Sequence, residues 1–325
     1  MNDRLKILYK VLGVILALYL FLVGIKGLSS GIKMLGGDFA NQIMTTTSNP
    51  FVSLLVGILA TTLFQSSSTT TSIIVGMVST GAVTLSGAIP MIMGANIGTT
   101  VTNTIVSMGH IRRGNEFKRA FSAATHHDIF NVLSVIILLP LEMAFGIIEK
   151  TATGLGTLLF GTISTDEVFQ SPIKVAIKWG SKHVQNLSFD SVSLYIILSV
   201  LLTFAMLFFI VKLLRSLVLN NIQQYFDKYI FKSAARAMAF GIVLTIMVQS
   251  SSITTSTIVP LAGAGVVKLH QLYPFTIGAN VGTTVTALLA SLTLNVTAMV
   301  AGFAHLFFNI FGIVIIFLNP LLKNI

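Results

Sequence analysis

The sequence predicts an all-α polytopic membrane protein built from two inverted structural repeats, each with a re-entrant or broken-helix segment that carries a Gln-Ser-Ser-Ser motif. Its 325 residues are 54% hydrophobic and only 9% charged, whereas a soluble domain carries about 25% charged residues. Uncharged polar strings interrupt the apolar runs and recur at a fixed interval. Too few charges remain to cover a water-facing surface, and helices satisfy their own backbone hydrogen bonds in lipid.

The charged residues indicate loops at a membrane surface. The net charge is +10, and the basic residues are scattered at the ends of apolar runs. Such scatter is typical of loops that set topology, whereas nucleic-acid binding requires basic residues clustered with aromatics on a soluble domain. We therefore expect no nucleic-acid partner. The chain has no cysteine, which excludes disulfides, thiolate chemistry and cysteine-based metal sites.

The first repeat is expected over residues 1–148. Its first apolar run, Ile7 to Ile25, is longer than the apolar core of a signal peptide and lacks a cleavage site, so it predicts a retained first helix. Phe51 to Phe64 has only 14 residues and runs straight into Gln65, whereas a span needs about 20. Non-helical backbone at that depth is tolerated only inside protein or beside a water-filled cavity. The interruption therefore predicts a re-entrant hairpin or a broken helix.

Two polar motifs of the first half return in the second half. Gln-Ser-Ser-Ser-Thr-Thr-Thr-Ser at 65–72 is matched by Gln-Ser-Ser-Ser-Ile-Thr-Thr-Ser at 249–256. Gly-Ala-Asn-Ile-Gly-Thr-Thr at 94–100 is matched at 278–284 with one substitution, and the same interval separates the two copies of both motifs. Matching at a fixed interval indicates one structural unit used twice. The second repeat is expected over residues 191–325.

The basic residues suggest how the repeats are oriented. They cluster at Arg4–Lys10, Arg112–Arg119 and Lys212–Arg236. These clusters and Lys323 fall on one side only if the repeats are inverted, and the positive-inside rule makes that side the cytoplasm. We expect a multi-pass protein of the inner (plasma) membrane with both termini cytoplasmic and an extracellular linker at 149–190. Interrupted apolar segments in inverted halves point to a binding site at a transporter's midplane.

The polar motifs have the chemistry of an ion site. Hydroxyls and side-chain amides both donate and accept hydrogen bonds, and helix N-termini at a break attract oxyanions. The motifs contain no Lys or Arg, so a co-bound cation such as Na⁺ would supply positive charge and couple the two ions. One helix face of the downstream motif is polar in both copies. Its residues are Asn96, Thr99, Thr100 and Asn103 in the first copy and Asn280, Thr283 and Thr284 in the second, where Ala287 takes the last position.

The sequence resembles the type II sodium/phosphate cotransporter family. The resemblance rests on both Gln-Ser-Ser-Ser strings, on the Gly-Ala-Asn-(Ile/Val)-Gly-Thr-Thr motif after each, and on the string His127-Asp128-Ile129-Phe130-Asn131. It covers roughly residues 10–148 and 190–320. It implies Na⁺-coupled symport of inorganic phosphate across the cytoplasmic membrane by alternating access, with both ions bound at the midplane between the paired motifs. The implied partners are inorganic phosphate, Na⁺ and the lipid bilayer, with a homodimer as one candidate assembly and no cofactor beyond the coupling ion.

The family's motifs indicate which residues are candidates for each ion. The phosphate candidates are Ser66, Ser67, Ser68, Asn96, Ser250, Ser251, Ser252 and Asn280. The sodium candidates are Gln65, Thr69, Thr99, Thr100, Asp128, Gln249, Thr254, Thr283 and Thr284. A carboxylate in a spanning helix is a functional candidate by default, so Asp128 either holds Na⁺ or a proton, or pairs with His126, His127 or a nearby base. We expect His127 and His305 to be hydrogen-bonded packing residues.

Three other functions fit parts of the sequence. A symporter or channel for another oxyanion is the nearest alternative, because hydroxyls do not choose among tetrahedral oxyanions. A passive channel would need no coupled site, and a structural protein could use the Ser and Thr residues to pack helices. We do not expect an enzyme, because nothing in the sequence indicates a serine activated by a base.

Overall fold

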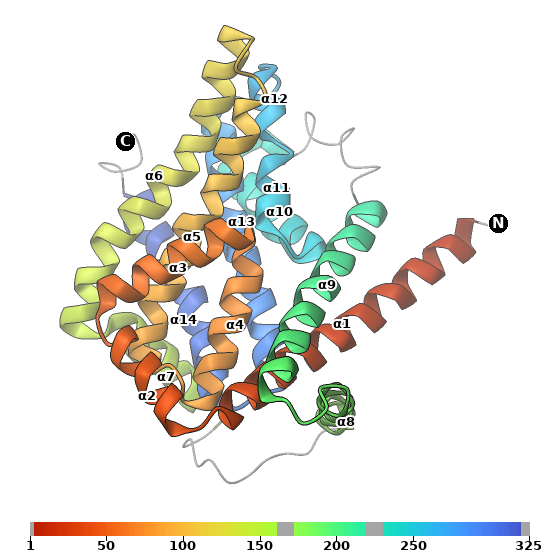
Figure 1. The fold of residues 1–325 in the computed structure, drawn as a ribbon. Coiled ribbons are helices and arrows are strands. Elements are labelled where there is room, and N and C mark those ends of the chain that lie inside the picture. The colour runs from red at the N-terminus through yellow and green to blue at the C-terminus, as the bar shows by residue number, and fades with distance from the viewer. Residues whose placement is uncertain (1–2, 161–171, 219–229, 320–325) are drawn as a thin grey trace.

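The computed structural model describes residues 3–160, 172–218 and 230–319, and this part of the chain contains helices and no strand. The all-helical fold class is therefore confirmed (Figure 1). The first half forms α1 (Asp3–Met34), α2 (Gly37–Thr47), α3 (Pro50–Phe64), α4 (Ser67–Thr80), α5 (Leu85–Met108), α6 (Gly114–Phe145) and α7 (Ile147–Phe160). The second half forms α8 (Pro172–Asn186), α9 (Val192–Val218), the 3₁₀ turn η3 (Ile230–Lys232), α10 (Ala234–Val248), α11 (Ser251–Ser256), α12 (Val259–Gly263), α13 (Leu269–Ser291), α14 (Val296–Gly312) and the π-helical turn η4 (Ile313–Phe317).

Four stretches of the described chain are long and apolar enough to cross a membrane. They are Ile7–Met34, Gly114–Phe145, Val192–Leu214 and Val296–Phe317. Helices α2 and α3 pass the same test only as a pair, and they are bent by 101° at their junction. The protein is thus a multi-pass helical membrane protein, as its composition predicts. Helices α7 and α8 flank residues 161–171 within the expected external linker; those residues, 219–229 of the third basic cluster and Lys323 lie outside the described residues.

Both Gln-Ser-Ser-Ser strings interrupt a helix in the same way. Helix α3 ends at Gln65 with φ 52° and ψ 27°, and α10 ends at Gln249 with φ 55° and ψ 27°. This left-handed conformation is uncommon for a residue other than glycine, and it stops a helix. The next residue, Ser66 or Ser250, is extended and caps the following helix. The copies then differ, because α4 continues for 14 residues whereas α11 has only 6 and is followed by the separate helix α12.

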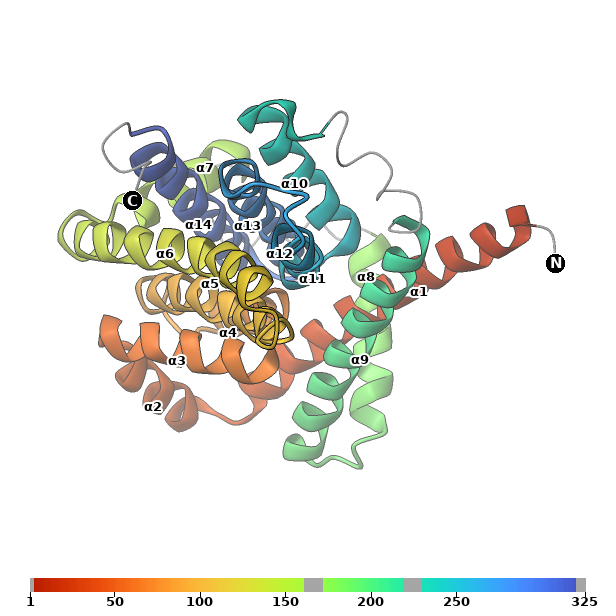
Figure 2. The same ribbon diagram turned by 90° about the horizontal axis from the view of Figure 1, so that it is seen from above.

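Small residues let the paired helices of each half approach closely. Helix α3 packs on α5, and α10 packs on α13. A side chain on Gly57 would collide with the carbonyl of Met91, and one on Gly241 would collide with the carbonyl of Phe275. Small residues commonly allow such backbone approach in membranes. Seen from above, α4, α5, α11 and α13 gather in the middle, and α1, α8 and α9 pack together at one side (Figure 2).

Contacts at the ends of α4 and α12 show at which end of the molecule each of these helices finishes. Asn295, in the α13–α14 turn, donates to the carbonyl oxygen of Ser79 near the end of α4 at 2.9 Å. Gly265, just after α12, faces the guanidinium of Arg119 near the start of α6. Helix α4 ends where α5 begins, and α6 begins where α5 ends. Helices α4 and α12 therefore finish at opposite ends of α5, with α12 near the top and α4 lower down in Figure 1.

Candidate binding site

The two helix breaks contact each other inside the molecule. The hydroxyl of Ser68 donates to the backbone oxygen of Gln249 at 3.3 Å. Ser66 accepts from the backbone N–H of Thr69 at 3.2 Å and so caps α4, and Ser250 caps α11 in the same way at 3.3 Å. The start of α4 is the positive end of a helix dipole. The break of one half thus meets the break of the other beside a helix end that suits an anion.

Each glutamine ties its break to the downstream motif of its own half. The side-chain oxygen of Gln65 accepts from the hydroxyl of Thr102 on α5 at 2.8 Å, and that of Gln249 accepts from Thr286 on α13 at 2.8 Å. Each amide nitrogen also donates to the carbonyl three residues before it. Both side chains therefore hold the break against the helix that carries the Gly-Ala-Asn motif.

Three serines of the two motifs keep a hydroxyl proton that is free to be donated, whereas most of the threonines predicted for sodium do not. In the described part of the chain, Ser67, Ser251 and Ser252 are buried and donate to no protein group. Five of the threonines predicted for sodium instead donate their only hydroxyl proton to a carbonyl of their own helix. They are Thr99, Thr100, Thr254, Thr283 and Thr284, at oxygen–oxygen distances of 2.7 to 3.1 Å. These serines can donate to an oxyanion, whereas these threonines can only accept, as a cation requires.

A buried chain of hydrogen bonds links the two halves behind the breaks. The hydroxyl of Thr255 donates to Oδ1 of Asn103 at 2.9 Å, and Nδ2 of Asn103 is 3.2 Å from Nδ1 of His127. Nε2 of His127 lies 2.8 Å from Oδ1 of Asn280, whose Nδ2 donates to Oδ1 of Asn131 at 2.8 Å. All five side chains are at most 1% exposed. Buried polar networks of this kind fix a single arrangement only when every member is satisfied.

One backbone oxygen sets the direction of the whole chain. Nδ2 of Asn131 donates to the carbonyl of Asn96 at 2.9 Å, and a carbonyl can only accept. Asn131 must therefore present its oxygen to Asn280, and Asn280 presents its own oxygen to His127. The imidazole then donates through Nε2 and accepts from Asn103 through Nδ1. The neutral Nε2–H tautomer of His127 satisfies every group, so the expectation of a hydrogen-bonded histidine is confirmed here.

The equivalent histidine of the second half is not satisfied. His305 and Asn309 are buried on α14, and both ring nitrogens of His305 and Oδ1 of Asn309 have no hydrogen-bond partner in the described structure. The expectation that His305 is hydrogen-bonded is therefore wrong. The physical reason is local, because Ala287 stands where the first half has Asn103 and offers no amide.

Asp128 lies next to His127 in sequence but outside the hydrogen-bonded chain. Its carboxylate accepts from the hydroxyl of Thr104 at 3.4 Å and is partly buried. The structure therefore pairs it with a threonine and not with His126 or His127. In the described residues, no group of three or more His, Asp or Glu side chains could hold a metal ion. The structure leaves the roles of Asp128 and the other candidates as predictions.

Sequence reasoning missed two matched pairs of threonines. Thr102 and Thr286 hold the two glutamines, and the interval between them is the one that separates the two copies of each motif. Thr61 and Thr245 are related by the same interval, and each is buried with a hydroxyl that has no partner in the described structure. The fixed interval was a signal that could have found both pairs.

Comparison with known proteins identifies the family to which the chain belongs. The chain matches the family described as Na+/Pi-cotransporter over residues 20–165 and 201–319. The chain belongs to this family. It is 35% identical over 376 residues to "Sodium-dependent phosphate transport protein 2A" of Rattus norvegicus, which covers 92% of this chain and 59% of that protein. It is 32% identical over 396 residues to "Sodium-dependent phosphate transport protein 2B" of Homo sapiens, covering 92% and 57%. The chain thus spans less than two thirds of the length of these relatives. No solved structure matches it.

Proposed function

We propose that the protein is a Na⁺-coupled symporter of inorganic phosphate that works by alternating access in the plasma membrane. The observation that carries the proposal is the contact between the two helix breaks, where buried serines keep unused hydroxyl donors. Membership of the Na+/Pi-cotransporter family supports the choice of ions. Two relatives whose names give sodium-dependent phosphate transport support it further.

The contacts at the helix ends support an inverted relation between the two repeats. The hairpins that follow the two breaks finish at opposite ends of α5, as two units of opposite orientation require. Arg119 and Lys268 lie at the end reached by α12. By the positive-inside rule that end faces the cytoplasm, and both termini are proposed to face it too. Discontinuous helices at an inverted-repeat interface suit a site near the midplane.

The difference between serines with unused hydroxyl donors and threonines with committed ones supports assigning the two groups to different ions. We assign the phosphate to Ser67, Ser251 and Ser252, because their donors are unused, and to the capped start of α4. Ser66, Ser68 and Ser250 border the same breaks. The threonines whose protons are already committed are assigned to Na⁺. Gln65, Gln249, Thr69 and Asp128 stay candidates for Na⁺, and Asn96 and Asn280 stay candidates for phosphate, although the amide of Asn280 is engaged with His127 and Asn131.

The experiment is ³²P-phosphate uptake into liposomes that contain the purified protein, with an inward Na⁺ gradient or with K⁺ in its place. Symport predicts uptake above the equilibrium level only with Na⁺. Equal uptake in both arms would indicate a passive channel. Uptake of sulfate or arsenate that phosphate does not compete against would indicate a transporter for another oxyanion.

Serine variants test the site itself. Ser67→Ala and Ser251→Ala each remove an unused donor, so we expect phosphate uptake to fall by about tenfold or more, in line with about 1.5–3 kcal/mol for a hydrogen bond to a charged group. Ser72→Ala is the matched control, because the hydroxyl of Ser72 is buried in the same motif but donates to the Ser68 carbonyl at 2.7 Å. Equal losses in all three variants would contradict the assignment.

A further inference from the structure

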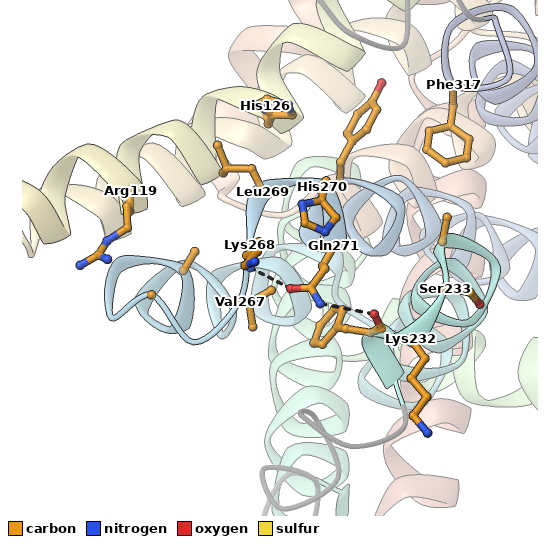
Figure 3. Close-up of a pocket in the computed structure, with 15 residues that line it drawn as sticks. Arg119, His126, Lys232, Ser233, Val267, Lys268, Leu269, His270, Gln271 and Phe317 are labelled. Atoms are coloured by element: carbon orange, nitrogen blue, oxygen red, sulfur yellow. Dashed lines mark hydrogen bonds between the residues drawn. The ribbon is translucent and has the colours of Figure 1, made fainter.

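A basic cavity of about 930 Å³ lies where α6, α12 and α13 meet the start of α10 (Figure 3). Arg119, Lys232 and Lys268 line it, together with His126 and His270. No Asp or Glu is among the described residues that line the cavity. A concave surface with charge of one sign concentrates its electric field and attracts ions of the opposite sign.

The first half contains a matching cavity with a different character. It has a volume of about 810 Å³ and is lined by Ser48 and Ser86, which occupy the positions equivalent to Lys232 and His270 in the repeat. Two glutamates and one lysine also line it. The repeated fold therefore makes a cavity at each of the two positions, but only the second cavity is basic. The basic residues are a property of that cavity and not of the repeat.

The residues before α5 and α13 also differ between the two halves, because only the second half has a basic residue there. Helix α5 begins after Thr84, whose hydroxyl accepts from the backbone N–H of Gly87 at 3.1 Å. Helix α13 begins after Lys268, which stands at the equivalent position. An ammonium cannot accept a hydrogen bond, and a cation beside a helix N-terminus is electrostatically unfavourable. A bound anion would offset both disadvantages.

The backbone at Gly265, next to α12, leaves room for the guanidinium of Arg119. Gly265 has φ +79°, and a Cβ at this position would lie 2.7 Å from the guanidinium of Arg119. Gln271 holds the lip of the cavity together, because its oxygen accepts from the N–H of Lys268 at 3.0 Å and its amide donates to the carbonyl of Phe231 at 3.4 Å (Figure 3). In the described part of the chain, neither Arg119 nor Lys268 forms an ion pair.

We propose that this cavity is a second anion site that binds a phosphate group through Arg119, Lys268 and the first N–H groups of α13. This second site is separate from the site proposed for symport. Asn280 of that site lies on the same helix eleven residues after Leu269, about 16 Å along the helix axis at 1.5 Å per residue. The volume falls in the range of about 300–1,000 Å³ of pockets that enclose whole ligands. Basic pockets between membrane helices bind phosphorylated lipid headgroups. A lipid headgroup and free phosphate are two sources of the same chemistry.

The test measures binding to the full chain in detergent, without Na⁺ and at constant ionic strength. Dioctanoyl phosphatidic acid is the probe in one arm and inorganic phosphate in another, with zwitterionic dioctanoyl phosphatidylcholine as the control lipid. Kd is measured by titration calorimetry, and the shift in Tm is measured alongside it. We expect saturable binding of phosphatidic acid, weakened about tenfold or more by the double variant R119Q/K268Q. Arg112→Gln is the matched control, because Arg112 is exposed in the turn between α5 and α6 and does not line the cavity.

Lys268→Thr separates binding from folding. It gives α13 the cap residue that α5 has, so Tm without ligand should stay the same or rise while affinity for phosphatidic acid falls. Tighter binding of inorganic phosphate, lost in the same variants, would assign the site to free phosphate. Equal binding of phosphatidic acid by the wild type, R119Q/K268Q and R112Q would overturn the proposal. So would a loss of binding that is equal in R119Q/K268Q and in the control R112Q. Because the readout is binding, its failure and a failure of Na⁺-dependent uptake are distinguishable.

Discussion

The two halves bury a histidine at equivalent positions of α6 and α14, yet only one of them is hydrogen-bonded. Both nitrogens of His127 have amide partners, on Asn103 of its own half and on Asn280 of the other half. Neither nitrogen of His305 has a partner in the described structure. Both side chains are 0% exposed. The same fold therefore supports two very different electrostatic environments.

Two residues account for the difference. Ala287 replaces the amide of Asn103, and Asn96 turns its Nδ2 to the Ile92 carbonyl of its own helix at 2.9 Å. The equivalent Asn280 instead donates across to Asn131. A buried polar group without a partner costs about 1–3 kcal/mol by mutational data. The second half carries this cost, whereas the first half uses the same residue types as a link between the repeats.

Removing the linked histidine should have the largest effect. His127→Ala leaves the amides of Asn103 and Asn280 unsatisfied, at about 1–3 kcal/mol for each, and also opens a cavity. His305→Ala opens a comparable cavity but strips no partner. We expect His127→Ala to lower Tm in detergent clearly more than His305→Ala. Equal losses in the two variants would contradict the hydrogen-bonded chain.

Asn103→Ala gives the first half the residue that the second half has at this position. It leaves Nδ1 of His127 and the hydroxyl of Thr255 without the Asn103 amide, although Thr255 keeps the Ser251 carbonyl at 2.8 Å. The expected destabilisation is about 1–3 kcal/mol, for one orphaned group. Denaturant unfolding measures it. In the double variant with His127→Ala the two losses should not add, because both remove the same interaction.

The repeated features of the sequence predicted the two helix breaks. They did not predict hydrogen bonds between side chains that are far apart in the chain. The short apolar run before Gln65 and its match before Gln249 predicted both helix breaks, because length and interval are properties of the chain. Nothing in the interval tells whether a buried histidine meets an amide on another helix. The partner of His127 is Asn280, 153 residues away. The sequence likewise predicted no helix within the linker expected at 149–190, yet its described parts include most of α7 and all of α8.

Substituting either of the two glutamines at the breaks should lower the stability of the protein. Gln65→Ala and Gln249→Ala each lose a hydrogen bond of 2.8 Å to a threonine, at about 1 kcal/mol. Gln249 is the less exposed of the two, so its loss should be the larger. Gln249→Gly should be less destabilising than Gln249→Ala, since a left-handed residue other than glycine costs about 1–2 kcal/mol. Thermal unfolding of the four variants, with Gln65→Gly as the fourth, checks both orders.

The smallest effect on stability is expected where the second half already lacks hydrogen bonds. His305→Leu replaces unpartnered polar atoms with an apolar side chain of similar size, and such a change is nearly neutral or stabilising because no partner loses a bond. Tm should stay within a few degrees of the wild-type value or rise, and His127→Leu is the matched comparison that should fall. A fall of similar size for His305→Leu would mean that His305 is satisfied after all. A maintained Tm with loss of Na⁺-dependent uptake would mean that His305 serves uptake and not stability.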